Sequence, residues 1–256
     1  MIDLFAGVGG LSLGFEQAGF ETLIANEYDA SIAEAYIKNR KHANMVVDDI
    51  TKLPISETFG KYKGQVTLVV GGPPCQGYSQ KGQRKTINDP RNFLFRYFVE
   101  VVKEVQPHYF VMENVPNLLT AEKGFFKQEL EKLFTELGYT INAQVLCAAD
   151  YGVPQNRYRV LFIGKLTDNF MYQVHFPEKV EGEPPTIKDA IGHYPVLQSG
   201  ESSNVPNHEA MVHSAQMLEK MSYVKDGGGR DDIPENIRPQ KGDIRKYIRY
   251  DSTKPS

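Results

Sequence analysis

The sequence predicts an α/β fold with a parallel sheet, followed by a second, smaller domain. Two observations support this prediction. Over the first two thirds of the chain, short apolar runs alternate with stretches of helical periodicity, which is typical of βαβ units. The chain also has 256 residues, near the upper size of one hydrophobic core, so it has room for a second domain.

The predicted elements follow one another in the order that βαβ units require. The first strand, at 2–5, leads into a glycine-rich turn at 7–10, and the helix after it ends at Gly19. Apolar runs and helical spacing then predict strands at 22–25, 45–47, 66–70, 109–112 and 160–163, and helices around 32–37, 93–105 and 125–137. We expect the strands at 45–47, 66–70 and 109–112 to be buried.

The composition and periodicity of the sequence change near Lys165. Beyond it, prolines and glycines separate short pieces without a clear helical or strand period, as at Glu183-Pro184-Pro185 and Gly227-Gly228-Gly229. We therefore expect one domain over 1–165 and a second region over 166–256.

Composition excludes several classes of protein. Hydrophobic residues make up 41% and charged residues 24%, which argues against wholesale disorder. Cys75 and Cys147, the two cysteines, cannot form a disulfide framework or a four-thiolate zinc site, so no metal is expected and a reducing, cytoplasmic location is favoured. No leader or membrane-spanning run is recognisable, and a soluble protein is expected.

The net charge of −3 means that any contact with nucleic acid must use local basic patches. Two clusters qualify, and a solvated surface is the alternative interpretation of both. The first comprises Lys81, Arg84, Lys85 and Arg91, and the second Lys241, Arg245, Lys246 and Arg249.

The glycine-rich turn between the first strand and first helix is a candidate ligand site. Such a turn lets the backbone approach a ligand and points helix amides towards it. The segment Asp3-Leu4-Phe5-Ala6-Gly7-Val8-Gly9-Gly10 lacks the last glycine of a dinucleotide fingerprint, because Ser12 stands there. A turn that only permits tight packing therefore remains an alternative.

Acidic residues at the same predicted edge favour a nucleoside ligand. Glu27 ends the second strand, 17 residues after Gly10, where a carboxylate meets ribose hydroxyls in nucleoside-binding sheets. Asp49, followed by Ile50, adds a further acid after the third strand, although Asp48 and Asp49 could be solvated loop residues. An acidic rim suits S-adenosylmethionine better than a cofactor with a pyrophosphate.

A cysteine follows the fourth predicted strand in the segment Gly71-Gly72-Pro73-Pro74-Cys75-Gln76-Gly77-Tyr78-Ser79. The two prolines stiffen the loop, so that Cys75 is a candidate nucleophile at the ligand edge. A small buried hydrophobe is the commoner role of cysteine, and it suits Cys147. A zinc deaminase is excluded, because it would need a second cysteine at position 78, which is Tyr. A site that methylates exocyclic amines is disfavoured, because such enzymes carry an aromatic residue where Cys75 stands.

Two further segments carry polar groups. Glu113, followed by Asn114 and Val115, comes directly after the strand at 109–112, and a solvated acid is the alternative interpretation. Gln155, Arg157 and Arg159 alternate at strand spacing, so we expect them to share a face on which the arginines could hold phosphate or a carboxylate. A solvated strand end would give the same pattern.

Taken in order, these segments resemble the DNA (cytosine-5) methyltransferase family. The resemblance covers residues 2 to about 165 and implies a Rossmann-like, S-adenosylmethionine-dependent methyltransferase sheet, with 166–256 as a partial target-recognition region. It rests on Asp3 to Gly10, Asn26-Glu27-Tyr28-Asp29, Asp49-Ile50, Gly72-Pro73-Pro74-Cys75-Gln76, Asp89-Pro90-Arg91-Asn92 with Leu94, Glu113-Asn114-Val115 and Gln155-Asn156-Arg157-Tyr158-Arg159.

The resemblance implies the reaction. Cys75 would add to C6 of a flipped-out cytosine while Glu113 supports N3, so that C5 can accept the methyl group, and Arg157 and Arg159 would hold the base and a phosphate. The implied cofactor site contains Phe5, Ala6, Gly7, Gly9, Gly10, Glu27, Tyr28, Asp49, Ile50, Pro74 and Leu94. The implied contacts with double-stranded DNA are Gln76, Ser79, Lys81, Arg84, Lys85 and Gln155, of which the lysines and Arg84 belong to a loop that would close on the phosphates.

The resemblance also implies segments that are not found here. The family's chain continues through target recognition and returns to the first domain with a Gly-Asn-x-Val segment, and neither this nor the accompanying helix motif occurs between Lys165 and Ser256. A second polypeptide that completes the enzyme is one explanation, and a truncated chain is another. A non-catalytic subunit remains an alternative function, whereas the tRNA-methylating branch is disfavoured because no Cys-Phe-Thr element is present. A restriction-modification system is the expected setting.

Overall fold

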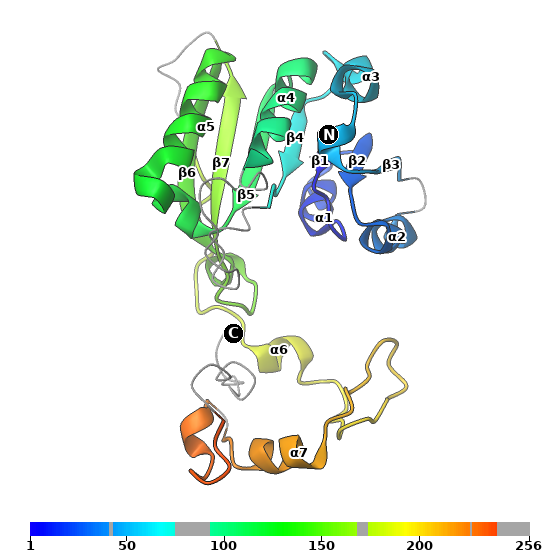
Figure 1. Ribbon diagram of the computed structural model, residues 1–256, viewed down its shortest axis with the longest axis vertical. Helices are drawn as coiled ribbons and strands as arrows, with labels where there is room; N and C mark the ends of the chain where they lie inside the picture. The colour runs from blue at the N-terminus through cyan, green and yellow to red at the C-terminus, as the bar shows by residue number, and fades with distance from the viewer. Residues whose placement is uncertain (41–42, 75–92, 168–173, 226, 240–256) are drawn as a thin grey trace. The chain divides into compact units, whose positions relative to one another are not determined.

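The computed structural model describes residues 1–40, 43–74, 93–167, 174–225 and 227–239. The chain divides into two compact units (Figure 1). The first comprises Met1–Leu146 and Tyr158–Pro177, and the second comprises Cys147–Arg157 and Glu178–Ser256. The domain boundary expected near residue 165 stays a prediction.

The first unit is built on a seven-stranded sheet with the order β3-β2-β1-β4-β5-β7-β6. Strands β1 to β5 run parallel to their neighbours, and β7 pairs antiparallel with β5. The strands are β1 (Ile2–Leu4), β2 (Ile24–Glu27), β3 (Met45–Val47), β4 (Leu68–Gly71), β5 (Tyr109–Asn114), β6 (Tyr139–Cys147) and β7 (Tyr158–Leu166). The order reverses between β1 and β4, and ligands of such sheets bind beside the carboxyl ends of the strands at this point.

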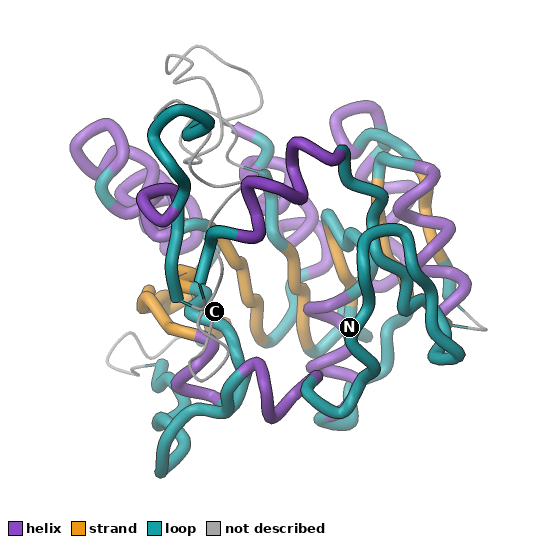
Figure 2. Tube along the Cα trace, turned by 90° about the horizontal axis from the view of Figure 1, so that it is seen from below, coloured by secondary structure: helices purple, strands orange, loops and turns teal. Residues whose placement is uncertain are grey.

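Helices cover both faces of this sheet because neighbouring residues of a strand point to opposite sides. On β5, Phe110 and Met112 join the larger core, to which α3 (Ile55–Phe59), α4 (Phe95–Val105) and α5 (Phe125–Glu136) contribute. Val111 joins a second core with residues from α1 (Gly10–Gln17), and Tyr36 of α2 (Ala30–Asn39) packs in a third cluster on Ala25 of β2. Seen from below in Figure 2, the strands of the sheet run side by side.

Most predicted elements are confirmed, with shifts at their ends. The strand predicted at 22–25 lies at Ile24–Glu27, so Glu27 belongs to the strand. β6 was not predicted, because its polar and apolar residues follow no strand period; its side chains are buried at both ends and half-buried or exposed between them. We expected the strands at 45–47, 66–70 and 109–112 to be buried. This is wrong for the first of them, β3, which is an edge strand with Val47 44% exposed. Cys147 is buried, as expected.

The second unit contains little regular structure in its described part. It has the short helices α6 (Ile187–Ile191) and α7 (Ala215–Ser222), each begun by a side-chain cap. Val224 and Ile233 form a small buried cluster with Met217 and Ile237. No helix within the described parts of either unit is both long enough and apolar enough to cross a bilayer.

Candidate active site at the carboxyl edge of the sheet

The carboxyl ends of the five parallel strands bring most of the described candidate residues to one edge of the first unit. The glycine-rich turn follows β1, Glu27 ends β2, and Asp49 comes two residues after β3. The segment Gly72–Pro74 follows β4, and Glu113 is the last residue but one of β5. Parallel pairing of adjacent strands fixes this arrangement.

The turn after β1 is held in an unusual backbone conformation. Phe5, Gly7 and Gly9 have positive φ angles of 56°, 58° and 86°. The amide of Ala6 donates to the carbonyl oxygen of Asn26 at 3.0 Å, and the amide of Gly9 donates to the carbonyl oxygen of Ala6 at 2.9 Å. Gly9 is the N-cap of α1 and has no side-chain cap, so the first amides of the helix remain directed at the ligand edge.

Glu27 is a buried carboxylate tied to this turn. It is 6% exposed, its Oε2 accepts the amide of Gly7 at 2.9 Å, and its Oε1 accepts the amide of Asp29 at 3.1 Å. Each carboxylate oxygen can accept more than one hydrogen bond, so Glu27 is oriented and keeps capacity for ligand hydroxyls. The neighbouring Tyr28 is 71% exposed.

Asn26 links the ends of β2 and β3. Its Nδ2 donates to the carbonyl oxygens of Val46 and Asp48, at 3.0 and 2.9 Å. Asp49 then accepts the amide of Thr51 at 3.0 Å and caps the single 3₁₀ turn that begins with the buried Ile50. Asp49 is therefore held beside β2, and no sequence pattern indicated that Asn26 takes part in holding it.

The segment after β4 is fixed against both neighbouring strands. A Cβ at Gly71 would lie 2.4 Å from the carbonyl oxygen of Leu4, so only glycine fits there. Asn114 is buried, and its Nδ2 donates to the carbonyl oxygen of Pro73 at 2.8 Å. Pro74 is half-buried. These contacts fix the backbone up to the residue that precedes Cys75.

Glu113 lies beside this segment and is paired with Arg159. A Cβ at Gly72 would be 3.2 Å from Oε2 of Glu113, and Nε of Arg159 lies 2.5 Å from Oε1. The two side chains are 28% and 27% exposed, and they come from the antiparallel strands β5 and β7. Arg159 also donates through Nη1 to the carbonyl oxygen of Tyr158 at 2.8 Å. The guanidinium therefore fixes one oxygen of the carboxylate.

The prediction that Gln155, Arg157 and Arg159 share a strand face is wrong. β7 begins at Tyr158, so only Arg159 lies on it. In the irregular segment before the strand, the carbonyl oxygen of Gln155 accepts the amide of Arg157 at 2.8 Å, and that of Arg157 accepts the amide of Ala148 at 2.9 Å. Both side chains are exposed and belong to the second unit. The prediction failed because the sequence does not show that the strand begins only at Tyr158.

The remaining predicted site residues are Leu94 and six residues of the segment after Pro74. Leu94 lies next to the start of α4 and packs against the larger core. The remaining ones fall outside the described residues: Cys75, Gln76, Ser79, Lys81, Arg84 and Lys85.

A buried polar network lies behind the glycine turn, and it was not predicted from the sequence. Asp3 of β1 is 1% exposed, and its Oδ2 accepts the hydroxyl of Ser12, which contacts the hydroxyl of Tyr36 at 3.2 Å. Burial raises the pKa of Asp3 from 3.8 to about 7, while Ser12 and Arg40 oppose that rise. Residues 3, 12, 36 and 40 carry no shared spacing, so no pattern could have identified the network.

Comparison with known proteins agrees with this geometry. The family model for C-5 cytosine-specific DNA methylase matches residues 1–254. The Type II methyltransferase M1.HphI of Haemophilus parahaemolyticus is 49% identical over 258 residues, which cover 100% of this chain and 68% of that protein. M.FnuDI of Fusobacterium nucleatum, also a Type II methyltransferase, is 41% identical over 192 residues, covering 75% of this chain and 54% of that protein.

A solved structure supports the fold. A protein described as a DNA modification methyltransferase encoded within an E. coli prophage has a TM-score of 0.67 at 28% identity, covering 89% of this chain and 65% of its own. The predicted Rossmann-like sheet is therefore confirmed. The chain spans about half to two thirds of the length of most of the curated relatives that it matches. By its sequence over nearly its whole length, and by its fold, the chain belongs to the C-5 cytosine-specific DNA methylase family.

Proposed function

We propose that this protein transfers a methyl group from S-adenosylmethionine to C5 of a flipped-out cytosine in double-stranded DNA, through a covalent adduct with Cys75. The observation that carries the proposal is the juxtaposition of the Glu113–Arg159 pair with the segment that leads into Cys75. The glycine turn and Glu27 lie at the same edge of the sheet. A methyl donor and an activated base could thus meet there.

S-adenosylmethionine is the methyl donor of this family, and the described residues fit it. Glu27 is buried yet keeps acceptor capacity, which suits the ribose hydroxyls of a nucleoside. The bound cofactor supplies an electrophilic methyl group on a sulfonium. The residues that would hold it are Phe5, Ala6, Gly7, Gly9, Gly10, Glu27, Tyr28, Asp49, Ile50, Pro74 and Leu94.

Protein groups would make C5 reactive. The Cys75 thiolate adds to C6, the electron pair of the C5–C6 double bond moves towards C5, and Glu113 supports N3. After C5 has accepted the methyl group, loss of its proton returns the electron pair to the ring and expels the thiolate. Arg159 keeps Glu113 oriented, because its Nε holds one carboxylate oxygen at 2.5 Å.

DNA contacts form the second part of the proposal. C6 is inaccessible in a stacked duplex, so the target must leave the helix. Arg157 and Gln155 are exposed and available to phosphate or base. Gln76, Ser79, Lys81, Arg84 and Lys85 are proposed to contact DNA from the segment after Cys75. We propose a cytoplasmic restriction-modification system as the setting, since Type II methyltransferases are among the relatives.

The adduct can be tested by trapping. DNA with 5-fluorocytosine at the target lacks the C5 proton, so the final elimination stops and the enzyme should remain attached to DNA in denaturing gels. Cys75→Ser should give no adduct and no methyl transfer, yet bind S-adenosylmethionine with unchanged affinity. Cys147→Ser, at the buried second cysteine, is the matched control and should still be trapped. An adduct formed by Cys75→Ser would refute the assigned nucleophile.

A second candidate is a subunit that requires another polypeptide. It is favoured by the length of the relatives, of which this chain spans about half to two thirds in most cases. Methylation by the chain alone should then be weak and rise when a chain carrying the return motifs is added. No rise would favour a non-catalytic role in binding DNA or a partner.

A further inference from the structure

The glycine turn is anchored at two points, and only one of them belongs to the family motif segments. On one side, the amide of Gly7 donates to Glu27 at 2.9 Å. On the other side, Nη2 of Arg40 donates to the carbonyl oxygen of Gly9 at 2.7 Å, across 31 residues of sequence. Arg40 is the C-cap of α2, and its side chain is 14% exposed.

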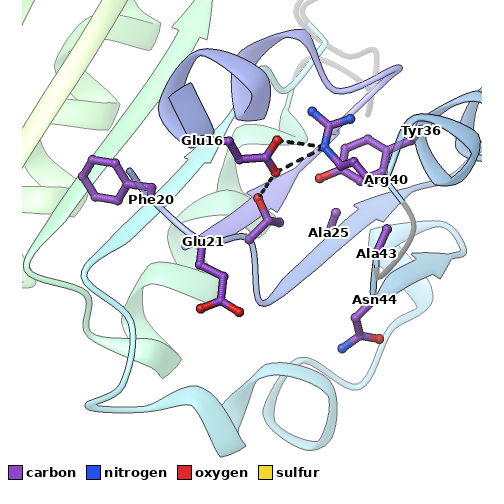
Figure 3. Close-up of a pocket in the computed structure, with 9 residues that line it drawn as sticks. Glu16, Phe20, Glu21, Ala25, Tyr36, Arg40, Ala43 and Asn44 are labelled. Atoms are coloured by element: carbon purple, nitrogen blue, oxygen red, sulfur yellow. Dashed lines mark hydrogen bonds and ion pairs between the residues drawn. The ribbon is translucent and has the colours of Figure 1, made fainter. Parts of the chain in front are cut away.

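Arg40 is itself held in place by two groups. Its Nε lies 3.0 and 3.2 Å from the two carboxylate oxygens of Glu16 on α1, and its guanidinium lies 4.1 Å from the centroid of the Tyr36 ring (Figure 3). These residues also line a pocket of about 330 Å³, so the guanidinium is not enclosed by packing on every side. Glu16 and Tyr36 therefore determine where it points.

The contact with the turn is tight. A Cβ at Gly9 would lie 2.3 Å from Nη1 of Arg40 and 2.7 Å from Cε2 of Tyr36, so these side chains occupy the space of a residue-9 side chain. Gly9 has φ 86°, a conformation that glycine can leave easily. Without Arg40, its carbonyl oxygen would keep only the amide of Leu13, at 3.0 Å.

We infer that Arg40, braced by Glu16, is a positioning residue for S-adenosylmethionine. It acts through the backbone of Gly9 and holds the turn in its binding conformation before the cofactor arrives. A turn that is already ordered loses less conformational entropy on binding. The inference rests on the cofactor site of the proposed function, and it predicts an effect on cofactor affinity that exceeds any effect on the chemical step.

The test compares Arg40→Met, which keeps an unbranched apolar side chain, with Lys38→Met. Lys38 is a nearby exposed cation of α2 that pairs with Glu34. We expect Arg40→Met to raise the dissociation constant for S-adenosylmethionine about tenfold, as loss of a charge-assisted hydrogen bond would. The turnover number at saturating cofactor should stay within about twofold. Lys38→Met should change neither quantity.

Hydrogen exchange of the free protein provides an independent readout. The amides of Gly9 and Leu13 should exchange faster in Arg40→Met and at the original rate in Lys38→Met. Glu16→Gln, which loosens Arg40 without removing it, should raise the dissociation constant about threefold, and it carries the test if Arg40→Met does not fold.

Unchanged exchange and unchanged affinity in a folded variant would overturn the inference, as would a fall in turnover without a change in affinity. Failure of the unsubstituted chain to bind the cofactor would instead count against the proposed function.

Discussion

The buried carboxyl group of Asp3 makes the stability of the first unit depend on pH. Its Oδ2 accepts the hydroxyl of Ser12, while Oδ1 has no hydrogen-bond partner among the described residues. Desolvation raises its pKa to about 7, and the charges that face it are Arg40, which lowers that pKa, and Glu16 and Glu27, which raise it. Between pH 3.8 and about pH 7, the folded protein therefore keeps a proton on Asp3 that the unfolded chain has released.

The pKa values give the magnitude and the sign. The raised pKa is about 7 and the ordinary value is 3.8, a difference of about 3 units at 1.36 kcal/mol each, or about 4 kcal/mol. Between these values the folded state binds more protons than the unfolded state, so the free energy of unfolding falls as the pH rises. The contribution is complete below pH 3.8 and lost above about pH 7.

Asp3→Asn removes the proton from this balance. Relative to the original protein, the variant should gain about 4 kcal/mol in free energy of unfolding between pH 4 and pH 8, measured by urea unfolding followed by circular dichroism. A difference in free energy of unfolding that is the same at every pH would reflect packing. A difference that changes with pH reflects the proton on Asp3. The reasoning is refuted if the difference stays constant across this range.

Glu34→Gln is a comparison with the opposite sign. The hydrogen bond and charge of Lys38 lower the pKa of Glu34, which is exposed on α2. The original Glu34 therefore contributes stability that is lost as the pH falls. Relative to the original protein, this variant should lose stability as the pH rises towards 4.5 and show a constant difference above it, measured by the same urea unfolding. The loss should be smaller than the gain of Asp3→Asn because the pair is solvated.

Three further predictions concern the site. Glu113→Gln should lower the turnover number by 10² to 10⁴ with cofactor affinity unchanged, because it removes the group at N3; methylation kinetics check this, and a change in affinity alone would contradict it. Arg159→Met should lower turnover by a smaller factor, measured in the same assay beside Arg157→Met, because it frees the carboxylate that its Nε holds. Gly71→Ala should lower the free energy of unfolding in the same urea titration by about 1–3 kcal/mol, since its Cβ would meet the carbonyl oxygen of Leu4. Gly14→Ala is the control: its Cβ meets nothing within 4 Å, so this variant should be neutral or stabilising.

Elements and motif positions were predictable where the signal is local. Apolar runs predicted the strands that became β1, β3, β4 and β5. The inner strands β4 and β5 have little polar alternation because both of their faces are covered, whereas β3 is an edge strand on which Val47 is exposed. β6 gave no such signal, because its buried, half-buried and exposed side chains follow one another without a strand period. The antiparallel direction of β7 and the turn at Gln155 to Arg157 also escaped prediction, since strand direction and turn position depend on where the chain returns to the sheet.

The sequence by itself determined the α/β class, the glycine turn, Glu27, Glu113 and the ordered set of segments that indicated the family, because each of these needs only neighbouring residues. Tertiary structure decided which groups hold them. Arg159 reaches Glu113 and Asn114 reaches Pro73 because strand pairing brings distant residues together. Arg40, at the end of α2, reaches Gly9 because its side chain crosses to α1. Hydrogen bonds of this kind join positions without any sequence period, so only the folded chain reveals them.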